Sequence, residues 1–236
     1  MSDNSFFIQG LKEYGFDPTD DQIDKFNRYY ELLIEWNEKI NLTAITEYKD
    51  VMIKHFLDSV SIIKAIDMSN VKNLIDVGTG GGFPGIPIKI MFPDIKITLL
   101  DSLKKRLNVL DLIIDDIELS DIYTIHGRAE DIARLPQHRE KYDLCVSRAV
   151  ANLSTLSELC IPFVKPEGKF VSYKSEKADE ELEGAKNAIK LLGGKVSSSV
   201  SFELEDNIRT LIVIDKEEST NKKYPRKAGT PGKEPL

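Results

Sequence analysis

The sequence predicts an α/β protein built on a doubly wound, mostly parallel sheet with a helical extension at its N-terminus. From residue 71 onward, short apolar segments alternate with segments of helical spacing, which is typical of parallel strands joined by helices. The last two apolar segments, 195–204 and 209–216, leave no room for a helix, so we expect them to form an antiparallel hairpin. Residues 1–70 show helical spacing only.

Two helices are expected in the N-terminal extension. Thr19 or Asp20 can cap a helix that runs through Leu42, because apolar residues recur near helical spacing along this segment. A second helix is expected over residues 47–66. The extension therefore ends near residue 70, where the pattern changes.

Seven strands are expected in the sheet, at 72–77, 96–101, 121–126, 142–147, 168–173, 195–204 and 209–216. The intervening helices are expected at about 85–91, 103–118, 152–160 and 176–192. These patterns divide the chain into a helical extension (1–70), a sheet domain (71–216) and a basic C-terminal tail (217–236).

Composition excludes several classes of protein. The chain has 236 residues and a net charge of −7, which argues against a protein that coats nucleic acid through its overall field. No apolar run approaches the ~20 residues needed to cross a bilayer. Cys145 and Cys160 lack metal-ligand spacing and are interpreted as core thiols in a reducing compartment. We expect a cytoplasmic protein without a metal site.

A glycine-rich loop is the strongest local signal. Residues 74–85 read LIDVGTGGGFPG, an apolar strand followed by a loop with five glycines, which lets the backbone approach a ligand closely. A second strand ends at Asp101, 19 residues after Gly82. At that spacing a carboxylate can reach ribose hydroxyls beside a glycine-rich turn. The pair predicts a nucleoside-containing cofactor.

The glycine spacing is compatible with two cofactors. Gly78, Gly80 and Gly82 form G-x-G-x-G, whereas Gly80, Gly82 and Gly85 match the dinucleotide pattern G-x-G-x-x-G. In the second register Pro84 removes an amide that should face a pyrophosphate. The terminal hairpin also replaces the second parallel half of a dinucleotide-binding sheet. S-adenosylmethionine is therefore favoured over NAD(P).

The two acidic residues at strand ends each have two possible roles. Asp76 could attract the amino group of the methionine moiety, or it could brace the loop by a hydrogen bond. Asp101 could hold the ribose, or it could cap the helix that begins near Leu103. Ser102 could take over that cap and leave the Asp101 carboxylate free.

Later strands bring further candidates to the same edge of the sheet. The segment GRAED (127–131) offers Ala129 and Glu130 where an adenine edge could be read. Arg148 ends the fourth strand, and Lys174 ends the fifth as a candidate for a phosphate or guanine O6.

The C-terminal tail carries a cluster of cations. Residues 222–227 read KKYPRK, so Lys222, Lys223, Arg226 and Lys227 could bind phosphates while Tyr224 stacks on an unpaired base. A solvated, poorly ordered C-terminus explains the composition equally well. The strand at 209–216 favours the first interpretation, because it anchors the cations beside the sheet.

Nearly the whole chain resembles the ribosomal RNA small subunit methyltransferase G family, also called glucose-inhibited division protein B. The matching stretches are NLTAIT (41–46), KHFLDS (54–59), DVGTGGGFPGIP (76–87), LLDSLKKR (99–106), GRAED (127–131), SRAVA (147–151) and YPRKAGTP (224–231). The sequence FELEDNI (202–208) departs from the family where a proline is expected after the leucine, which affects loop geometry only.

The resemblance implies a class I S-adenosylmethionine-dependent methyltransferase with a Rossmann-like sheet that methylates guanine N7 in the 530 loop of 16S rRNA. The implied cofactor contacts are Gly78, Phe83, Ala129, Glu130 and Arg148, with Asp101 at the ribose. N7 already carries a lone pair, so no general base is expected, and Lys174 and Arg148 would position the reactants.

The negative net charge predicts weak binding of naked RNA. With the rRNA substrate that the resemblance implies, we expect the enzyme to act on an assembled or partly assembled small subunit, and we expect it to be a monomer. His55, Asp58 and Ser59 share a helix face and are interpreted as a tie between the extension and the sheet. A small-molecule methyltransferase would share the cofactor site, and a NAD(P)-binding oxidoreductase is a further alternative.

Overall fold

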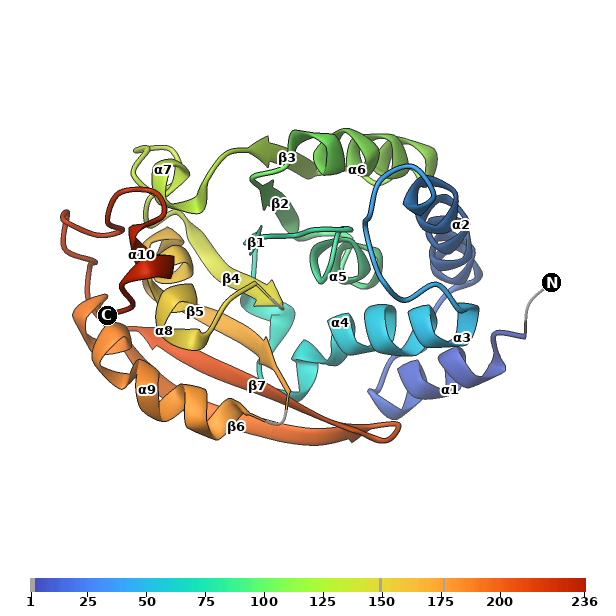
Figure 1. The fold of residues 1–236 in the computed structure, drawn as a ribbon. Helices are drawn as coiled ribbons and strands as arrows, with labels where there is room; N and C mark the ends of the chain where they lie inside the picture. The colour runs from blue at the N-terminus through green and yellow to red at the C-terminus, as the bar shows by residue number, and fades with distance from the viewer. Residues whose placement is uncertain (1–2, 149, 176) are drawn as a thin grey trace.

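The computed structural model describes residues 3–148, 150–175 and 177–236, and it contains the predicted seven-stranded sheet. The strand order is β3-β2-β1-β4-β5-β7-β6 (Figure 1). The strands are β1 (Asn73–Val77), β2 (Lys96–Asp101), β3 (Ile122–His126), β4 (Tyr142–Arg148), β5 (Val164–Lys174), β6 (Gly194–Leu204) and β7 (Asn207–Lys216).

The sheet combines a parallel part with the expected hairpin. Strands β1 to β5 run parallel, whereas β7 pairs antiparallel with both β5 and β6. From β1 the chain leads outward to β2 and β3 on one side. It then returns to β4 on the other side of β1, so the strand order reverses between β1 and β4. Ligands of doubly wound sheets bind outside the carboxyl ends of the strands at such a switch point. The glycine-rich loop follows β1 at this position.

The N-terminal helices and two crossover helices cover one face of the sheet, on the right in Figure 1. They are α1 (Ser5–Glu13), α2 (Asp20–Asn37), α5 (Gly85–Met91), α6 (Lys104–Asp116) and a helical segment at 48–64. Helix α1 was not predicted, although Phe7 and Leu11 lie one turn apart and are both buried. Thr19 caps α2 as expected, with a capping box completed by Gln22.

Helix α2 ends five residues before the predicted Leu42. The side chain of Asn37 explains the difference, because its Oδ1 accepts hydrogen bonds from the backbone N–H groups of Leu42 (2.8 Å) and Thr43 (2.9 Å). A side chain that satisfies backbone donors in this way competes with continuation of the helix. The chain turns there and brings Leu42 to the edge of the sheet's ligand side.

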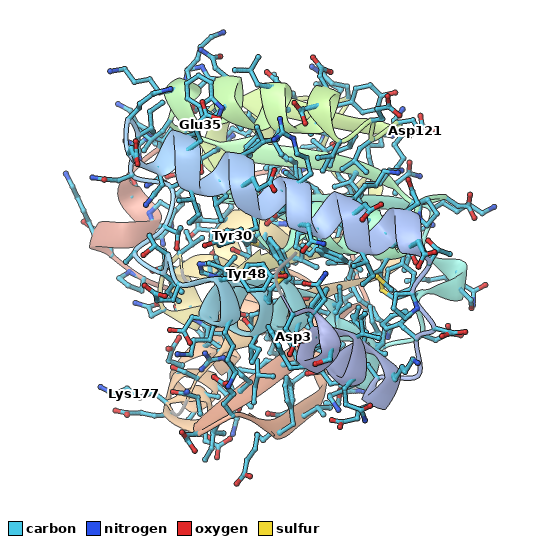
Figure 2. The ribbon with its side chains drawn as sticks, turned by 90° about the vertical axis from the view of Figure 1, so that its right-hand side faces the viewer. Asp3, Tyr30, Glu35, Tyr48, Asp121 and Lys177 are labelled. Atoms are coloured by element: carbon cyan, nitrogen blue, oxygen red, sulfur yellow. The ribbon has the colours of Figure 1, made fainter. Side chains whose placement is uncertain are left out.

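The second helical segment changes its winding along its length. It comprises α3 (Tyr48–Val51), a π-helical stretch (Met52–Leu57), α4 (Asp58–Val60) and a 3₁₀ turn (Ser61–Lys64). Figure 2 shows Tyr30 and Tyr48 together between this segment and α2, where their rings meet edge to face with centroids 4.9 Å apart. π-Helical turns often occur at functional sites, and this one carries His55.

Other helices cover the opposite face, on the left in Figure 1. They are α7 (Ala129–Ile132), α8 (Leu153–Cys160), α9 (Ala178–Leu191) and α10 (Thr230–Lys233), with 3₁₀ turns at Met68–Asn70 and Ile161–Phe163 elsewhere in the fold. Cys145 and Cys160 are buried free thiols, as predicted. Within the described ranges, no helix combines the length and apolar character that crossing a bilayer requires.

Candidate ligand-binding site

A cavity of about 570 Å³ opens at the predicted switch point, and we call it the glycine-loop cavity. Its volume lies within the range of about 300–1,000 Å³ typical of small-molecule sites. Seven predicted cofactor residues line it: Gly78, Gly80, Phe83, Asp101, Ala129, Glu130 and Arg148. Its wall also contains residues that the sequence did not single out as ligand contacts, among them Leu42, His55, Thr79, Thr155, Gly229 and Gly232.

The glycines of the loop have different tasks. Gly78, Gly80 and Gly82 all adopt positive φ, at 74°, 59° and 98°, a region that side chains disfavour. A Cβ on Gly80 would meet nothing closer than the Gly78 carbonyl at 4.0 Å, so Gly80 faces open space. A Cβ on Gly82 would lie 2.5 Å from the Tyr29 hydroxyl, and Gly82 does not line the cavity. Its predicted role as a cofactor contact is therefore corrected to one in close packing.

Asp76 braces the loop from below. Its side chain is fully buried, and Oδ2 accepts hydrogen bonds from the Thr79 hydroxyl (2.7 Å) and the Gly85 amide (2.9 Å). Oδ1 is buried without a hydrogen-bond partner among the described residues. Burial raises the pKa of Asp76 to about 7, against the lowering effect of those hydrogen bonds. The contacts support the loop-bracing alternative, and Asp76 does not line the cavity.

We expect Asp76→Asn to remove a pH dependence of folding stability. Because the folded pKa of about 7 lies above the ordinary 3.8, Asp76 binds its proton more tightly in the folded state. Its contribution to the free energy of unfolding is therefore full below pH 4 and declines as the pH rises toward 7. Urea unfolding should show the wild type losing stability relative to Asp76→Asn between pH 5 and pH 8. A constant difference between the two proteins across this range would contradict the assignment.

Asp101 serves both the loop and the next helix. Its Oδ2 accepts a hydrogen bond from the Gly80 amide (2.9 Å), and its Oδ1 accepts one from the Leu103 amide (2.8 Å). The expectation that Ser102 would take over the cap and free this carboxylate is wrong, because Asp101 itself binds the Leu103 amide. The Asp101 carboxylate still borders the cavity, so it is held in a defined position beside any ligand there.

Phe83 and Arg148 meet the N-terminal extension at His55. The imidazole stacks on the Phe83 ring with centroids 4.4 Å apart, and the Arg148 guanidinium lies 5.0 Å from the same ring. Burial and the nearby Arg148 lower the pKa of His55 to about 3. The neutral ring accepts a hydrogen bond from Arg148 at Nδ1 (3.1 Å), so Nε2–H donates to the Thr43 hydroxyl (2.6 Å).

The same cluster confirms the predicted tie between extension and sheet. Arg148 Nη1 lies 2.7 Å from Asp58 Oδ2, and both side chains are almost completely buried. Arg209 on β7 lies 3.3 Å from the other oxygen of Asp58. The Tyr173 hydroxyl donates to the Ser59 carbonyl at 2.6 Å. The motif KHFLDS thus links the sheet to the wall of the cavity through His55.

The opposite end of the cavity lies at the start of α7. Ala129 and Glu130 line the cavity there, and Glu130 is buried. Its Oε1 accepts a hydrogen bond from the Gly229 amide at 2.8 Å. Thr155, at the start of α8, completes this end of the wall. These residues are small, apolar or acidic, as expected for a site that receives a purine edge.

The structure divides the basic cluster of the tail. The side chains of Lys222, Lys223 and Lys227 are exposed, which leaves them available to an anionic partner. Tyr224 is only 5% exposed and belongs to the core beside α8, so the expectation that it stacks on an unpaired base is corrected. Arg226 is engaged by Glu158, with Nη2 2.6 Å from Oε2, and it holds the tail on α8.

Lys174 lies beside the cavity and does not line it. Its ammonium group pairs with Glu181 (2.7 Å) and donates to the Ala151 carbonyl (2.7 Å), and its side chain is 8% exposed. Ala151 itself lines the cavity. The contacts therefore support a role for Lys174 in holding the segment after β4 rather than in binding a phosphate directly.

Comparison with known proteins identifies relatives over the whole length of this chain. The family model described as rRNA small subunit methyltransferase G matches residues 22–212. A protein of Lachnoclostridium phytofermentans called ribosomal RNA small subunit methyltransferase G is 53% identical over 238 residues, which cover 100% of this chain and 98% of that protein. Proteins of the same name from Listeria monocytogenes (49% identical, 98% of each chain) and Clostridium botulinum (50% identical, 95% of each chain) are also similar.

Solved structures share the sheet at low sequence identity. TrmN from Thermus thermophilus superimposes with a TM-score of 0.54 and 16% identity over 68% of this chain and 48% of that chain. P. horikoshii TYW2 in complex with MeSAdo gives a TM-score of 0.53 and 13% identity over 68% of this chain and 61% of that chain. At these identities the likeness establishes the fold, and it confirms the predicted class I sheet.

Proposed function

The chain belongs to the rRNA small subunit methyltransferase G family, and from this premise we propose that it methylates guanine N7 in the 530 loop of 16S rRNA. It is a methyltransferase that uses S-adenosylmethionine. The main support for the proposal is the glycine-loop cavity. It brings together the open backbone at Gly80, the fixed carboxylate of Asp101 and the residues Ala129 and Glu130 at one switch point. N7 and the 530 loop come from the family resemblance of the motifs.

The residues of the cavity fit S-adenosylmethionine. Gly80 leaves room for close approach of a ligand to the backbone, and Gly78 lines the cavity beside Val150. Asp101 presents a carboxylate that is suited to ribose hydroxyls, and Ala129 and Glu130 border the end suited to adenine. Phe83 supplies an aromatic wall that His55 and Arg148 hold in place. When bound, S-adenosylmethionine supplies an electrophilic methyl group.

The chemistry places modest demands on the protein. Guanine N7 has a free lone pair at neutral pH, so the acceptor needs no deprotonation. The protein must orient the acceptor and exclude water, and orientation can contribute up to about 7–11 kcal/mol in well-oriented systems. Arg148, fixed by Asp58 and His55, is a rigid part of this arrangement, and Lys174 secures the Ala151 segment beside it.

RNA contact is proposed for exposed cations of the tail and of α6. Lys222, Lys223 and Lys227 lie on the tail, while Lys104 and Lys105 begin α6 directly after the cavity residue Leu103. These local charges act within a chain of net charge −7, which weakens the overall attraction to naked RNA. We therefore propose that a monomer acts in the cytoplasm on an assembled or partly assembled small subunit, whose proteins and folded RNA add contacts.

The function is tested by radiolabelled methyl transfer to small subunits that lack the modification. We expect one labelled guanine, in the 530 loop, with the label at N7, and much slower labelling of a short naked RNA that spans the loop. Equal rates on the subunit and the naked RNA would refute the subunit as substrate. Label on another nucleotide, or on a different atom of guanine, would refute the proposed target.

A further inference from the structure

The C-terminal segment has a second role that its charge does not suggest. Gly229 and Gly232 line the glycine-loop cavity, although they lie about 100 residues beyond Ala129 and Glu130, the residues they approach. The segment follows the basic cluster directly and includes the short helix α10. Three sets of contacts hold this segment at the cavity.

The first set secures the approach of the tail to the sheet domain. Arg139 donates from Nη2 to the Thr220 carbonyl (2.7 Å) and from Nη1 to the Tyr224 carbonyl (2.9 Å). Arg134 donates to the Pro225 carbonyl at 2.5 Å. The two arginine side chains thus donate to carbonyl groups of an irregular backbone that has no strand partner. The buried Tyr224 ring anchors the same segment in the core.

The second set ties the tail to α8. Glu158 is only 1% exposed, and both of its oxygens accept hydrogen bonds from the Arg226 side chain while Oε1 also accepts one from the Arg226 amide (2.6 Å). Arg226 further donates to the Glu234 carbonyl at 2.7 Å, which closes the segment on itself. A buried carboxylate that meets a guanidinium in this geometry is expected to hold the tail firmly.

The third set lies in the wall of the cavity itself. The Gly229 amide donates to Glu130 Oε1 at 2.8 Å, and the Thr155 hydroxyl donates to the Pro231 carbonyl at 3.1 Å. Glu130 and Thr155 both line the cavity. The tail therefore orients the Glu130 carboxylate and covers the end of the cavity that Ala129 lines. A backbone that turns through Gly229 at a φ of 83° brings this amide to Glu130.

We propose that residues 229–232 are part of the S-adenosylmethionine site, where they close its purine end and fix the Glu130 carboxylate. This inference rests on the proposed placement of the cofactor in the glycine-loop cavity. The exposed cations Lys222, Lys223 and Lys227 lie on the same tail, directly before these residues. RNA that binds the cations therefore contacts a tail that is already held at the cofactor site. Loss of the tail should therefore weaken cofactor binding in the absence of any RNA.

The test measures binding of S-adenosylhomocysteine by calorimetry to the full chain and to a variant that ends at Lys227. This variant keeps Arg226, Glu158 and the buried Tyr224, and it loses the Gly229 and Pro231 contacts. We expect its Kd to rise about tenfold or more. A matched variant with Lys222→Ala, Lys223→Ala and Lys227→Ala keeps the backbone contacts, so its Kd should stay within about twofold of the full chain while its affinity for RNA falls.

Two outcomes would overturn the inference. One is a truncated protein that melts as a folded domain and binds S-adenosylhomocysteine as tightly as the full chain does. The other is measured by hydrogen exchange on the full chain, an experiment that tests the inference even if the truncated variant does not fold. Addition of S-adenosylhomocysteine should protect peptides from residues 228–236, and unchanged exchange there would refute a contact. A full chain that binds no S-adenosylhomocysteine would instead refute the proposed function.

Discussion

Replacing Arg148 by alanine is expected to lower the rate of methyl transfer about 100-fold or more and to cost about 3–5 kcal/mol of unfolding free energy. The guanidinium pairs with buried Asp58 at 2.7 Å, donates to the Lys54 carbonyl at 3.1 Å and lies against Phe83. Its loss leaves Asp58 buried with the weaker Arg209 contact at 3.3 Å. The same change frees His55 and the aromatic wall of the cavity.

Two matched variants separate charge from geometry. Arg209→Ala removes the more exposed partner of Asp58 and should cost much less stability, with the cavity wall intact. Arg148→Lys restores a positive charge but cannot reproduce the planar contact with Phe83 or the several hydrogen bonds of the guanidinium. We expect it to regain part of the stability and little of the activity. Urea unfolding and single-turnover methyl transfer measure the two effects. Equal losses for Arg148→Ala and Arg209→Ala would contradict this network.

Gly82→Ala is expected to destabilise the protein by about 2–5 kcal/mol and to abolish cofactor binding through collapse of the loop. An alanine at a φ of 98° costs about 1–2 kcal/mol. Its Cβ would also lie 2.5 Å from the Tyr29 hydroxyl and 2.6 Å from Ile86 Cδ1, and such overpacking adds about 1–3 kcal/mol. Tyr29 is fully buried and donates a hydrogen bond to the Gly81 carbonyl, so it has little freedom to move.

Gly80→Ala is the matched control for this substitution. Gly80 also has positive φ, but its Cβ would face open space in the cavity. The stability cost should therefore be limited to the backbone term of about 1–2 kcal/mol, while S-adenosylhomocysteine affinity falls because the new methyl group occupies ligand space. Thermal unfolding and calorimetry report the two quantities. Similar losses of stability in both variants would contradict the distinction between a packing glycine and a ligand-facing glycine.

Local patterns were sufficient to predict most of the sheet. The alternation of apolar segments and helices identified all seven strands. Strands β1 and β2 are mostly apolar because they are buried on both faces, whereas β6 alternates between half-buried and exposed residues. The chain length between residues 204 and 209 dictated the terminal hairpin, which β6 and β7 form. The helices that were not predicted, α1, α7 and α10, are short, and each begins without a side-chain cap. The end of α2 was misplaced because the Asn37 side chain competes with the helix, and propensity alone does not show this.

Side-chain roles were predictable only where the backbone already determined them. Asp76 and Asp101 lie at the carboxyl ends of β1 and β2, which had to meet at the switch point. Their positions were therefore predicted, but the partners of each oxygen were not. Tyr224 and Arg226 were predicted to bind RNA together with Lys222 and Lys223, because the composition of a short segment does not show which of its side chains are buried. The structure separates them, since burial is decided by contacts with α8 that lie far away in the sequence.

Residue patterns alone were enough to predict the succession of strands and helices along the chain, the position of the glycine loop at the switch point and the class of cofactor. These follow from periodicity and from short-range geometry, which act over a few residues. The residues that complete the site could be identified only from the folded structure, because His55, Thr155 and Gly229 come from three distant segments that packing brings together. Their contacts depend on burial and on long-range hydrogen bonds, and local sequence patterns predict neither.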